Sequence, residues 1–218
     1  MIPKFQSETS LVVIDAQRGV DVIEHWGGAN GHRNNPQAED RIAELLAAWR
    51  ARGRSVVFTQ HDSREHASPL KVALASGGFK PGLEPLPGES VITKDVNGGF
   101  IGTNLEILLR RAGATRIVVA GFFTNMCVET TVRQAGNMGF DTYLAEDACA
   151  TTNRVGFDGT NYPAATVHAL AVASMHGEFC TALTTRRIVG LLDADAGDLM
   201  NVQGNRPPHD CSIFGRRL

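Results

Sequence analysis

Short runs of consecutive apolar residues recur along the chain, and longer segments with a helical pattern separate them. The runs predict six strands, at residues 11–14, 55–59, 90–93, 116–120, 142–145 and 181–183. Most runs are continuously apolar rather than alternating, which is typical of strands that are buried on both faces of a parallel sheet. A sheet of this kind needs helices over both faces.

The intervals between the runs supply such helices. The segment 37–52 repeats apolar residues at helical spacing, among them Leu45 and Trp49, and a glycine follows where a helix commonly ends. Four more helices are predicted at 103–112, 126–138, 163–176 and 186–192. The alternation predicts an α/β fold: a three-layer α/β/α domain around a mainly parallel, six-stranded, doubly wound, Rossmann-like sheet.

The composition is that of a folded chain. Of its 218 residues, 43% are hydrophobic and 20% are charged, which excludes a disordered or fibrous protein. The length favours a single domain, 1–218, with an irregular tail over about 201–218. A formal charge of −2 offers no basic excess, so we expect no nucleic-acid partner.

Neither the apolar runs nor the cysteines indicate a membrane or an oxidising compartment. No run approaches the roughly 18 residues that a membrane span needs, and the N-terminus turns polar before a signal-peptide core could form. The four cysteines form no C-x-x-C pair, so a zinc knuckle or a dithiol redox motif has no support. We therefore expect a cytoplasmic protein without a membrane partner.

An acid, an amine and a thiol follow three of the predicted strands. Asp15 ends the first strand, Lys94 ends the third, and Cys127 follows the fourth, where a turn becomes a helix. Ligands of parallel sheets bind beyond the carboxyl ends of the strands, so the three side chains are expected on one rim. A helix terminus and a nearby ammonium would lower the thiol pKa, and the acid could accept the proton.

Each of these residues also has an ordinary structural interpretation at this point. Cysteine is among the most buried residue types, an aspartate after a strand often caps a turn, and most lysines are simply solvated. Position alone does not decide between the two interpretations.

Three linked motifs give the rim a more specific context. Residues 119–135, VAGFFTNMCVETTVRQA, resemble the G-x-x-T-x-x-C-V-x-x-T-x-x-x-A signature of isochorismatase-like cysteine hydrolases. That group includes nicotinamidases, N-carbamoylsarcosine amidohydrolases, and ureidoacrylate and biuret hydrolases. Asp15-Ala16-Gln17 resembles the D-x-Q segment of the family, and residues 94–103 resemble its lysine segment, K-x-x-x-x-x-F-x-G-T. Order and spacing agree from about residue 11 to residue 192.

The resemblance implies a catalytic triad of Asp15, Lys94 and Cys127. It also implies a cis peptide bond between Phe122 and Phe123, and an oxyanion hole made by the backbone N–H groups of Phe123 and Cys127. In the usual strand order 3-2-1-4-5-6, Lys94 lies two strand spacings, roughly 9.6 Å, from the first strand. Its side chain would therefore have to reach back over the second strand.

Further residues near the triad are candidates for contact with the substrate. The expected substrate-binding residues are Gln17, Asn97, Phe100, Phe123 and Asn125. His25 and Trp26 could equally line the pocket or lie on a surface loop, and His168 is expected to be a packed core histidine.

The sequence departs from the metal-dependent members of the family. Nicotinamidases carry a D-x-H…H zinc site after the second strand, whereas residues 59–66 here read TQHDSREH, which breaks that spacing. We therefore expect no metal and no cofactor. A chance pair such as His61 and His66 is expected on the surface or hydrogen-bonded rather than as a ligand set.

The triad implies a hydrolase that cleaves a C–N bond of a small amide, ureide or carbamoyl compound through a cysteine thioester. Two alternatives stay open: a vinyl-ether hydrolase of the isochorismatase type, and a non-catalytic binding or assembly module of the same fold. The expected partners are a small-molecule substrate and further copies of the chain, in a homodimer or homotetramer.

Overall fold

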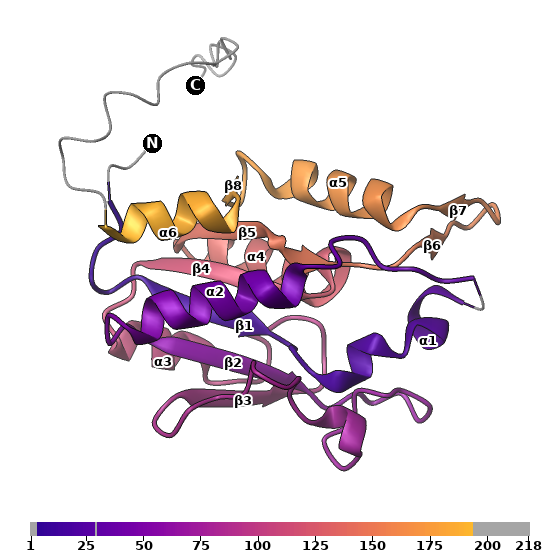
Figure 1. Cartoon of the computed structure of the whole chain (residues 1–218), viewed down its shortest axis with the longest axis horizontal. Coiled ribbons are helices and arrows are strands. Elements are labelled where there is room, and N and C mark those ends of the chain that lie inside the picture. Colours follow the sequence, from indigo (N-terminus) through magenta and orange to yellow (C-terminus); the bar gives the residue numbers. More distant parts are fainter. Residues whose placement is uncertain (1–3, 29, 194–218) are drawn as a thin grey trace, which may run out of the picture.

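One parallel sheet organises the molecule (Figure 1), a computed structural model that describes residues 4–28 and 30–193. Its strand order is β3-β2-β1-β4-β5-β8, and each neighbouring pair is parallel. The strands are β1 (Ser10–Ile14), β2 (Val56–His61), β3 (Ser90–Lys94), β4 (Arg116–Phe122), β5 (Asp141–Ala150) and β8 (Thr181–Leu183). All six predicted strands are confirmed, although β5 continues well beyond its predicted end. The tail expected over 201–218 lies outside the described residues.

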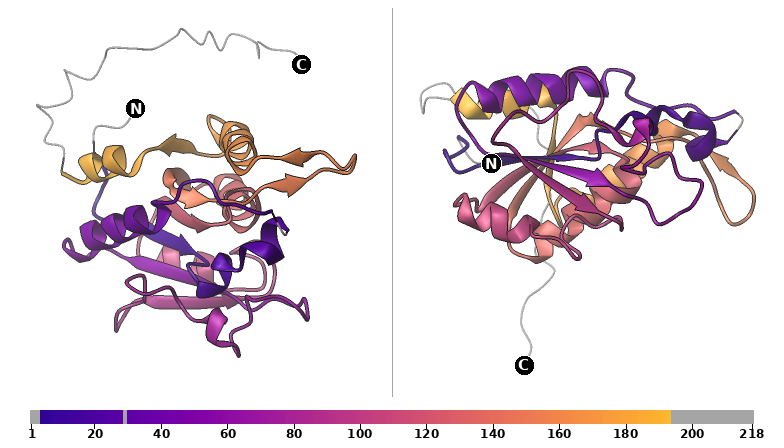
Figure 2. Two further views of the ribbon diagram at one scale, coloured as in Figure 1. Left: turned by 45° about the vertical axis from the view of Figure 1, so that its right-hand side comes forward. Right: turned by 90° about the horizontal axis from the view of Figure 1, so that it is seen from below.

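Helices cover both faces of the sheet (Figure 2). The five predicted helices are present as α2 (Ala38–Arg50), α3 (Leu105–Arg111), α4 (Glu129–Asn137), α5 (Ala164–Met175) and α6 (Thr185–Asp193). Helices α2 and α6 lie on one face, and α3 and α4 lie on the other, where α5 packs beside α4. The predicted three-layer α/β/α architecture is confirmed.

The continuous apolar runs arise because each strand packs into two cores. On β1, Leu11 and Val13 belong to the hydrophobic cluster beneath α2, which includes Trp49. Val12 and Ile14 point to the opposite face and belong to the cluster beneath α3 and α4. Since every residue of β1 is buried, the strand has no solvent side on which polar residues would alternate.

Several short elements carry no clear sequence pattern. They are the 3-10 turns η1 (Arg18–Asp21) and η2 (Ala75–Gly77), the short helix α1 (Ile23–Gly27), and the antiparallel hairpin of β6 (Arg154–Val155) and β7 (Asn161–Tyr162). Hydrogen bonds from one side chain hold α1 and β7 together: the Asn153 amide donates both to the carbonyl of Gly27 in α1 and to Asn161 Oδ1 in β7. Among the helices of residues 4–28 and 30–193, none combines the length and the hydrophobicity of a membrane-spanning segment.

The predicted helix at 126–138 begins differently from the expectation. Residues Thr124–Val128 form a single π turn, η3, in which Met126 has non-helical dihedral angles, and the regular helix α4 starts only at Glu129. Cys127 is therefore held in an irregular turn between β4 and α4. Such π turns are common at functional sites.

Candidate active site

Asp15 directly follows β1 at the carboxyl edge of the sheet, in the left-handed backbone region with φ of 48°. Thr59 of β2 orients it: the Asp15 N–H donates to Thr59 Oγ1 at 3.1 Å, and that hydroxyl donates to Asp15 Oδ1 at 2.6 Å. The other carboxylate oxygen, Oδ2, accepts a hydrogen bond from Lys94 Nζ at 2.7 Å. Both oxygens are thus held in place, and the side chain is almost fully buried.

Lys94 does reach over the second strand, as the strand order requires. Its ammonium lies at hydrogen-bond distance from three acceptors: Asp15 Oδ2, His61 Nδ1 at 3.0 Å and the carbonyl of Val96 at 3.2 Å. Burial by itself would lower the pKa of Lys94, but interactions with Asp15 and Cys127, foremost with the Asp15 carboxylate, outweigh burial and raise that pKa. Lys94 is therefore a buried cation whose charge is paired with the Asp15 carboxylate.

Cys127 completes the cluster from the opposite side of β1. Its Sγ, one carboxylate oxygen of Asp15 and one ring nitrogen of His61 all lie within 4.8 Å of one another. The thiol is 3.6 Å from the Oδ1 atom of Asn97, to which it donates. The structure therefore brings together the three residues of the expected triad, which lie just after β1, at the end of β3 and in η3, and adds His61 from the end of β2.

The expected lowering of the thiol pKa is wrong for this arrangement. Burial raises the pKa of Cys127, the Asp15 carboxylate raises it further, and the opposing influence of Lys94 is smaller. The reason is that the charge of Lys94 is already paired with Asp15, while Cys127 lies in an irregular turn rather than at the first residue of α4. The resting form of the side chain is the neutral thiol.

A pocket of about 330 Å³ opens above this cluster. Its polar lining includes Cys127 of the expected triad and the neighbouring side chains of His61 and Asn97, together with Glu65 and Arg154. Aromatic side chains form part of its wall: the rings of Trp26 and Phe123 lie 5.0 Å apart. His25 packs edge-on against Trp26 and also lines the pocket, so the loop-surface alternative for these two residues is excluded.

Of the expected substrate-binding residues, Asn97 and Phe123 line this pocket, whereas Gln17, Phe100 and Asn125 do not. Phe100 instead stacks on Phe140, with ring centroids 5.9 Å apart. Asn125 accepts a hydrogen bond from Thr151 Oγ1 and borders a separate hollow beside α5. Phe100 and Asn125 were expected in the pocket because they lie near Lys94 and Cys127 in the sequence. In the structure the chain turns away from the pocket at both positions.

Gln17 is fully buried and serves the backbone of β2. Its Oε1 accepts from the His61 N–H at 2.7 Å, and its Nε2 donates to the carbonyls of His61 at 3.0 Å and Gly77 at 2.9 Å. The assignment of Gln17 to the substrate is therefore corrected: all of these hydrogen bonds go to the main chain, and they fix the position of His61.

The peptide bond between Phe122 and Phe123 is cis, as the resemblance implies. It lies at the end of β4, where Gly121 pairs with Ile14 of β1. Continuing this register places Phe122 opposite Asp15 and Phe123 one residue beyond it, on the side of β1 opposite His61. The backbone N–H of Phe123 thus belongs to the segment that leads into η3, the turn that holds Cys127.

His61 is the site residue that the sequence analysis missed. It is buried and hydrogen-bonded, whereas His66 is exposed. Burial lowers the pKa of His61, and the Lys94 ammonium lowers it further. One signal was present in the sequence: His61 follows the predicted strand 55–59 by two residues, at the same edge of the sheet as Asp15 and Lys94.

The residues present do not fit a metal ion. Asp15, His61 and Cys127 are close enough to share one, but the Lys94 ammonium lies between the first two and uses the His61 Nδ1 lone pair. A divalent cation would have to displace this positive charge, and charge repulsion opposes that.

His168, expected as a core histidine, is indeed buried and contacts Thr124 Oγ1 at 2.9 Å.

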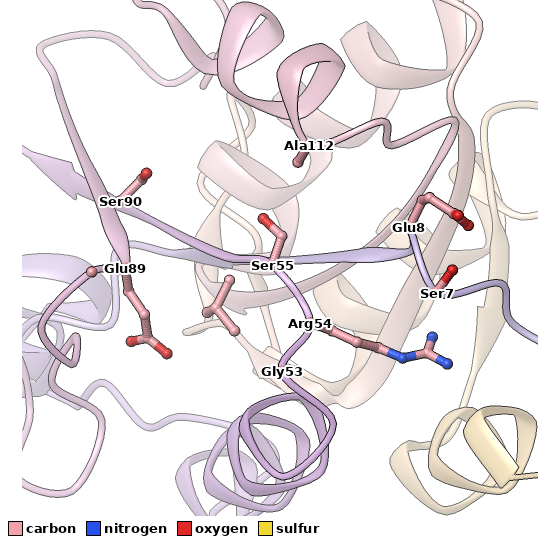
Figure 3. A pocket seen from close by; sticks show the side chains of 10 residues that line it. Ser7, Glu8, Gly53, Arg54, Ser55, Glu89, Ser90 and Ala112 are labelled. Atoms are coloured by element: carbon pink, nitrogen blue, oxygen red, sulfur yellow. The ribbon is translucent and has the colours of Figure 1, made fainter.

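A second pocket, of about 470 Å³, lies at the opposite end of the sheet, near the amino ends of β2 and β3 (Figure 3). Polar side chains such as Glu8, Arg54 and Glu89 surround it. Its lining, within the described residues, includes no cysteine, histidine or lysine. The larger pocket therefore offers hydroxyls, carboxylates and a guanidinium, but not the combination of thiol, ammonium and imidazole that surrounds Asp15 at the carboxyl edge.

Comparisons with known proteins identify the family and agree with the fold. A family model described as the Isochorismatase domain matches residues 9–187. A crystal structure of an isochorismatase-family protein from Chromobacterium violaceum is 43% identical, covers 88% of this chain and 97% of its own, and has a TM-score of 0.81.

Two relatives known by sequence are also similar over most of the chain. Isochorismatase family protein YrdC of Bacillus subtilis is 39% identical over 184 residues, which cover 84% of this chain and 96% of YrdC. Ureidoacrylate amidohydrolase RutB of Agrobacterium fabrum is 36% identical over 192 residues, which cover 70% of this chain and 78% of RutB. Because the domain match spans most of the chain and the fold agrees, this chain belongs to the isochorismatase family.

Proposed function

We propose that this chain is a hydrolase that cleaves the C–N bond of a small amide, ureide or carbamoyl compound through a thioester on Cys127. The observation that carries the proposal is that Sγ of Cys127 lies within 4.8 Å of the Asp15 carboxylate in a pocket. A nucleophile beside a fixed base is the arrangement that acyl transfer requires. The similarity to an amidohydrolase, RutB, supports the choice of a C–N bond.

In the first half of the reaction, Asp15 takes the proton of the Cys127 thiol while the sulfur attacks the substrate carbonyl. Proton transfer accompanies attack because the resting thiol is neutral. The backbone N–H groups of Phe123 and Cys127 hold the developing oxyanion. The tetrahedral adduct then collapses, the C–N bond breaks, and the protonated Asp15 gives its proton to the departing nitrogen.

In the second half, Asp15 accepts a proton from water as the water oxygen attacks the thioester carbon. The second tetrahedral adduct expels Cys127, which recovers its proton from Asp15, and a carboxylic or carbamic acid is released. Both steps use the same carboxylate, so its position has to be fixed. Thr59 and Lys94 supply that position by hydrogen bonds to separate oxygens of Asp15.

The Cys127 nucleophile is tested by measuring the release of ammonia or amine from a panel of amides, ureides and carbamoyl compounds. Cys127→Ala is expected to lower turnover at least about 10³-fold, since the covalent path is lost. Cys180→Ala is the matched control, because Cys180 has the same 7% exposed fraction but lies outside the pocket. It should keep wild-type turnover.

Two other results would each favour an alternative. Hydrolysis of a vinyl ether that survives in Cys127→Ala would indicate isochorismatase-type chemistry. A wild-type protein that turns over no member of the panel, yet binds some of them, would indicate a binding module.

A further inference from the structure

His61 presents one ring nitrogen to the triad and the other to the pocket. Nδ1 contacts the Lys94 ammonium at 3.0 Å. Within residues 4–28 and 30–193, Nε2 has no hydrogen-bond partner, and it is not sealed from solvent. Since His61 also lines the pocket, Nε2 is accessible to a molecule bound there.

The contact with Lys94 decides which nitrogen carries the proton. An ammonium group has only donors, so Nδ1 must offer its lone pair at this distance. A neutral ring whose Nδ1 is unprotonated carries its proton on Nε2. A second proton on Nδ1 would place two N–H donors against each other beside a buried positive charge.

The groups around His61 keep the ring in that state. Burial and Lys94 lower the pKa of His61, and they outweigh Asp15, Asp62 and Asp95, which raise it. The main chain is fixed as well, because Gln17 bonds both the N–H and the carbonyl of His61. The Nε2–H group is therefore a neutral donor with a fixed direction.

We propose that His61 is a specificity-determining residue whose Nε2–H donates a hydrogen bond to a carbonyl or carboxylate oxygen of the substrate. The proposal rests on the proposed function, because it takes the Cys127 pocket as the substrate site. The strand order gives the direction: β2 and β4 flank β1 on opposite sides. If the scissile carbonyl oxygen points to the Phe123 side, the rest of the substrate extends toward His61.

The substrate class that follows has a second acceptor beyond the scissile carbonyl. Acylureas, ureido acids and N-acyl amides fit this description, whereas simple alkylureas and alkylamides do not. A substrate that placed an amino group here would meet two facing donors. His61 would thus select among compounds that the triad alone could hydrolyse.

The tautomer is tested directly by NMR of protein labelled with ¹⁵N-histidine, in which His61 is assigned by comparison with His61→Asn. The expected result is a neutral ring with its proton on Nε2 and a titration midpoint below the ordinary histidine value of 6.5. An Nδ1–H ring, or a midpoint at or above pH 6.5, would overturn the proposal. Addition of N-acetylurea, which carries a second carbonyl, should shift the His61 ring signals.

Specificity is tested with N-acetylurea and N-isopropylurea, which differ mainly in the distal carbonyl. In His61→Asn the side-chain oxygen can still accept from Lys94, but the donor at the Nε2 position is lost. The preference for N-acetylurea, measured as a ratio of kcat/KM values, should fall at least about tenfold. His61→Gln can place an N–H near that position, so it should keep the ratio even if kcat falls. His66→Asn changes an exposed histidine and should leave the ratio of kcat/KM values unchanged.

These outcomes separate the two proposals. An unchanged ratio in His61→Asn with active wild-type protein would refute the role of His61 and leave the proposed function standing. Wild-type protein that hydrolyses neither compound would count against the proposed function. In that case the NMR spectrum decides about His61: the absence of a shift on adding N-acetylurea would refute its role.

Discussion

At the scale of single residues, the polar groups around Cys127 compensate one another. Lys94 and Asp15 form an ion pair, and His61 accepts from the same ammonium. The cluster is therefore neutral while Cys127 is protonated, and ionisation of the thiol would add an uncompensated buried charge. This is the physical reason why the pKa of Cys127 is raised rather than lowered.

This charge state predicts the pH dependence of alkylation. A raised thiol pKa means that the thiolate fraction grows about tenfold per pH unit until the pH reaches that pKa. The rate of Cys127 modification by iodoacetamide, followed by mass spectrometry, should therefore still be rising at pH 9. A plateau below pH 8 would show a preformed thiolate and contradict the assignment.

At the scale of elements, the close approach of β1 and β4 fixes the relative position of the chain segments that carry Asp15 and Phe123. Gly121 has φ of 129°, and a Cβ there would lie 2.1 Å from the carbonyl oxygen of Ile14. Ile14 immediately precedes Asp15, and Gly121 immediately precedes the cis peptide. A larger residue at 121 would push apart the two chain segments that carry the base and the proposed oxyanion donor.

Gly121→Ala should therefore cost several kcal/mol of unfolding free energy, about 3 kcal/mol or more, because backbone strain and a clash with backbone act together. Chemical denaturation measures this. Gly190→Ala on α6 is the control: nothing lies within 4 Å of its Cβ position and its φ is not positive, so it should stabilise by about 0.5–1 kcal/mol. Equal effects of the two substitutions would contradict the account.

At the scale of the whole molecule, an ion network joins segments that lie far apart in the sequence. Arg33 makes two hydrogen bonds of 2.7 Å to Glu39 of α2, and Lys80 bonds both Glu39 and Asp21 of η1. The Arg33 and Lys80 cations also lie 5.3 and 5.6 Å from the centroid of the Phe122 ring. The network thus supports the pocket wall from behind.

Glu39 makes this network sensitive to acid. Burial raises the pKa of Glu39, but hydrogen bonds from Arg33 and Lys80 outweigh burial and lower it. A lowered folded-state pKa stabilises the fold above the unfolded value of about 4.5, and this stability is lost as the pH falls through the folded value.

Glu39→Gln should therefore destabilise the protein by about 1–3 kcal/mol at pH 7, and the difference from wild type should shrink below about pH 4.5. Denaturation curves at several pH values measure both effects. Glu44→Gln, which removes a half-exposed pair with Arg41 on the same helix, should cost less than about 0.5 kcal/mol. A difference between Glu39→Gln and wild type that is constant with pH would contradict this role.

The local pattern of apolar residues was sufficient to predict the six strands of the sheet, the five longer helices and their order along the chain. The buried strands required runs without polar alternation, and the helices required one apolar face, so both could be located within a few residues. The short elements α1, β6 and β7 could not, because hydrogen bonds between distant residues such as Asn153 and Gly27 hold them. For the site, the motifs identified Asp15, Lys94 and Cys127, but they did not indicate that Gln17 contacts main chain.

The sequence by itself therefore determined the layered fold and the set of reactive groups at one edge of the sheet, because periodicity and strand ends are local properties. Only the tertiary structure decided the charge of the thiol, the partner of Gln17 and the place of His61. These depend on which side chains meet across β1, β2 and β3, and on how much water is excluded there. Distances between strands, rather than spacing along the chain, set those energies.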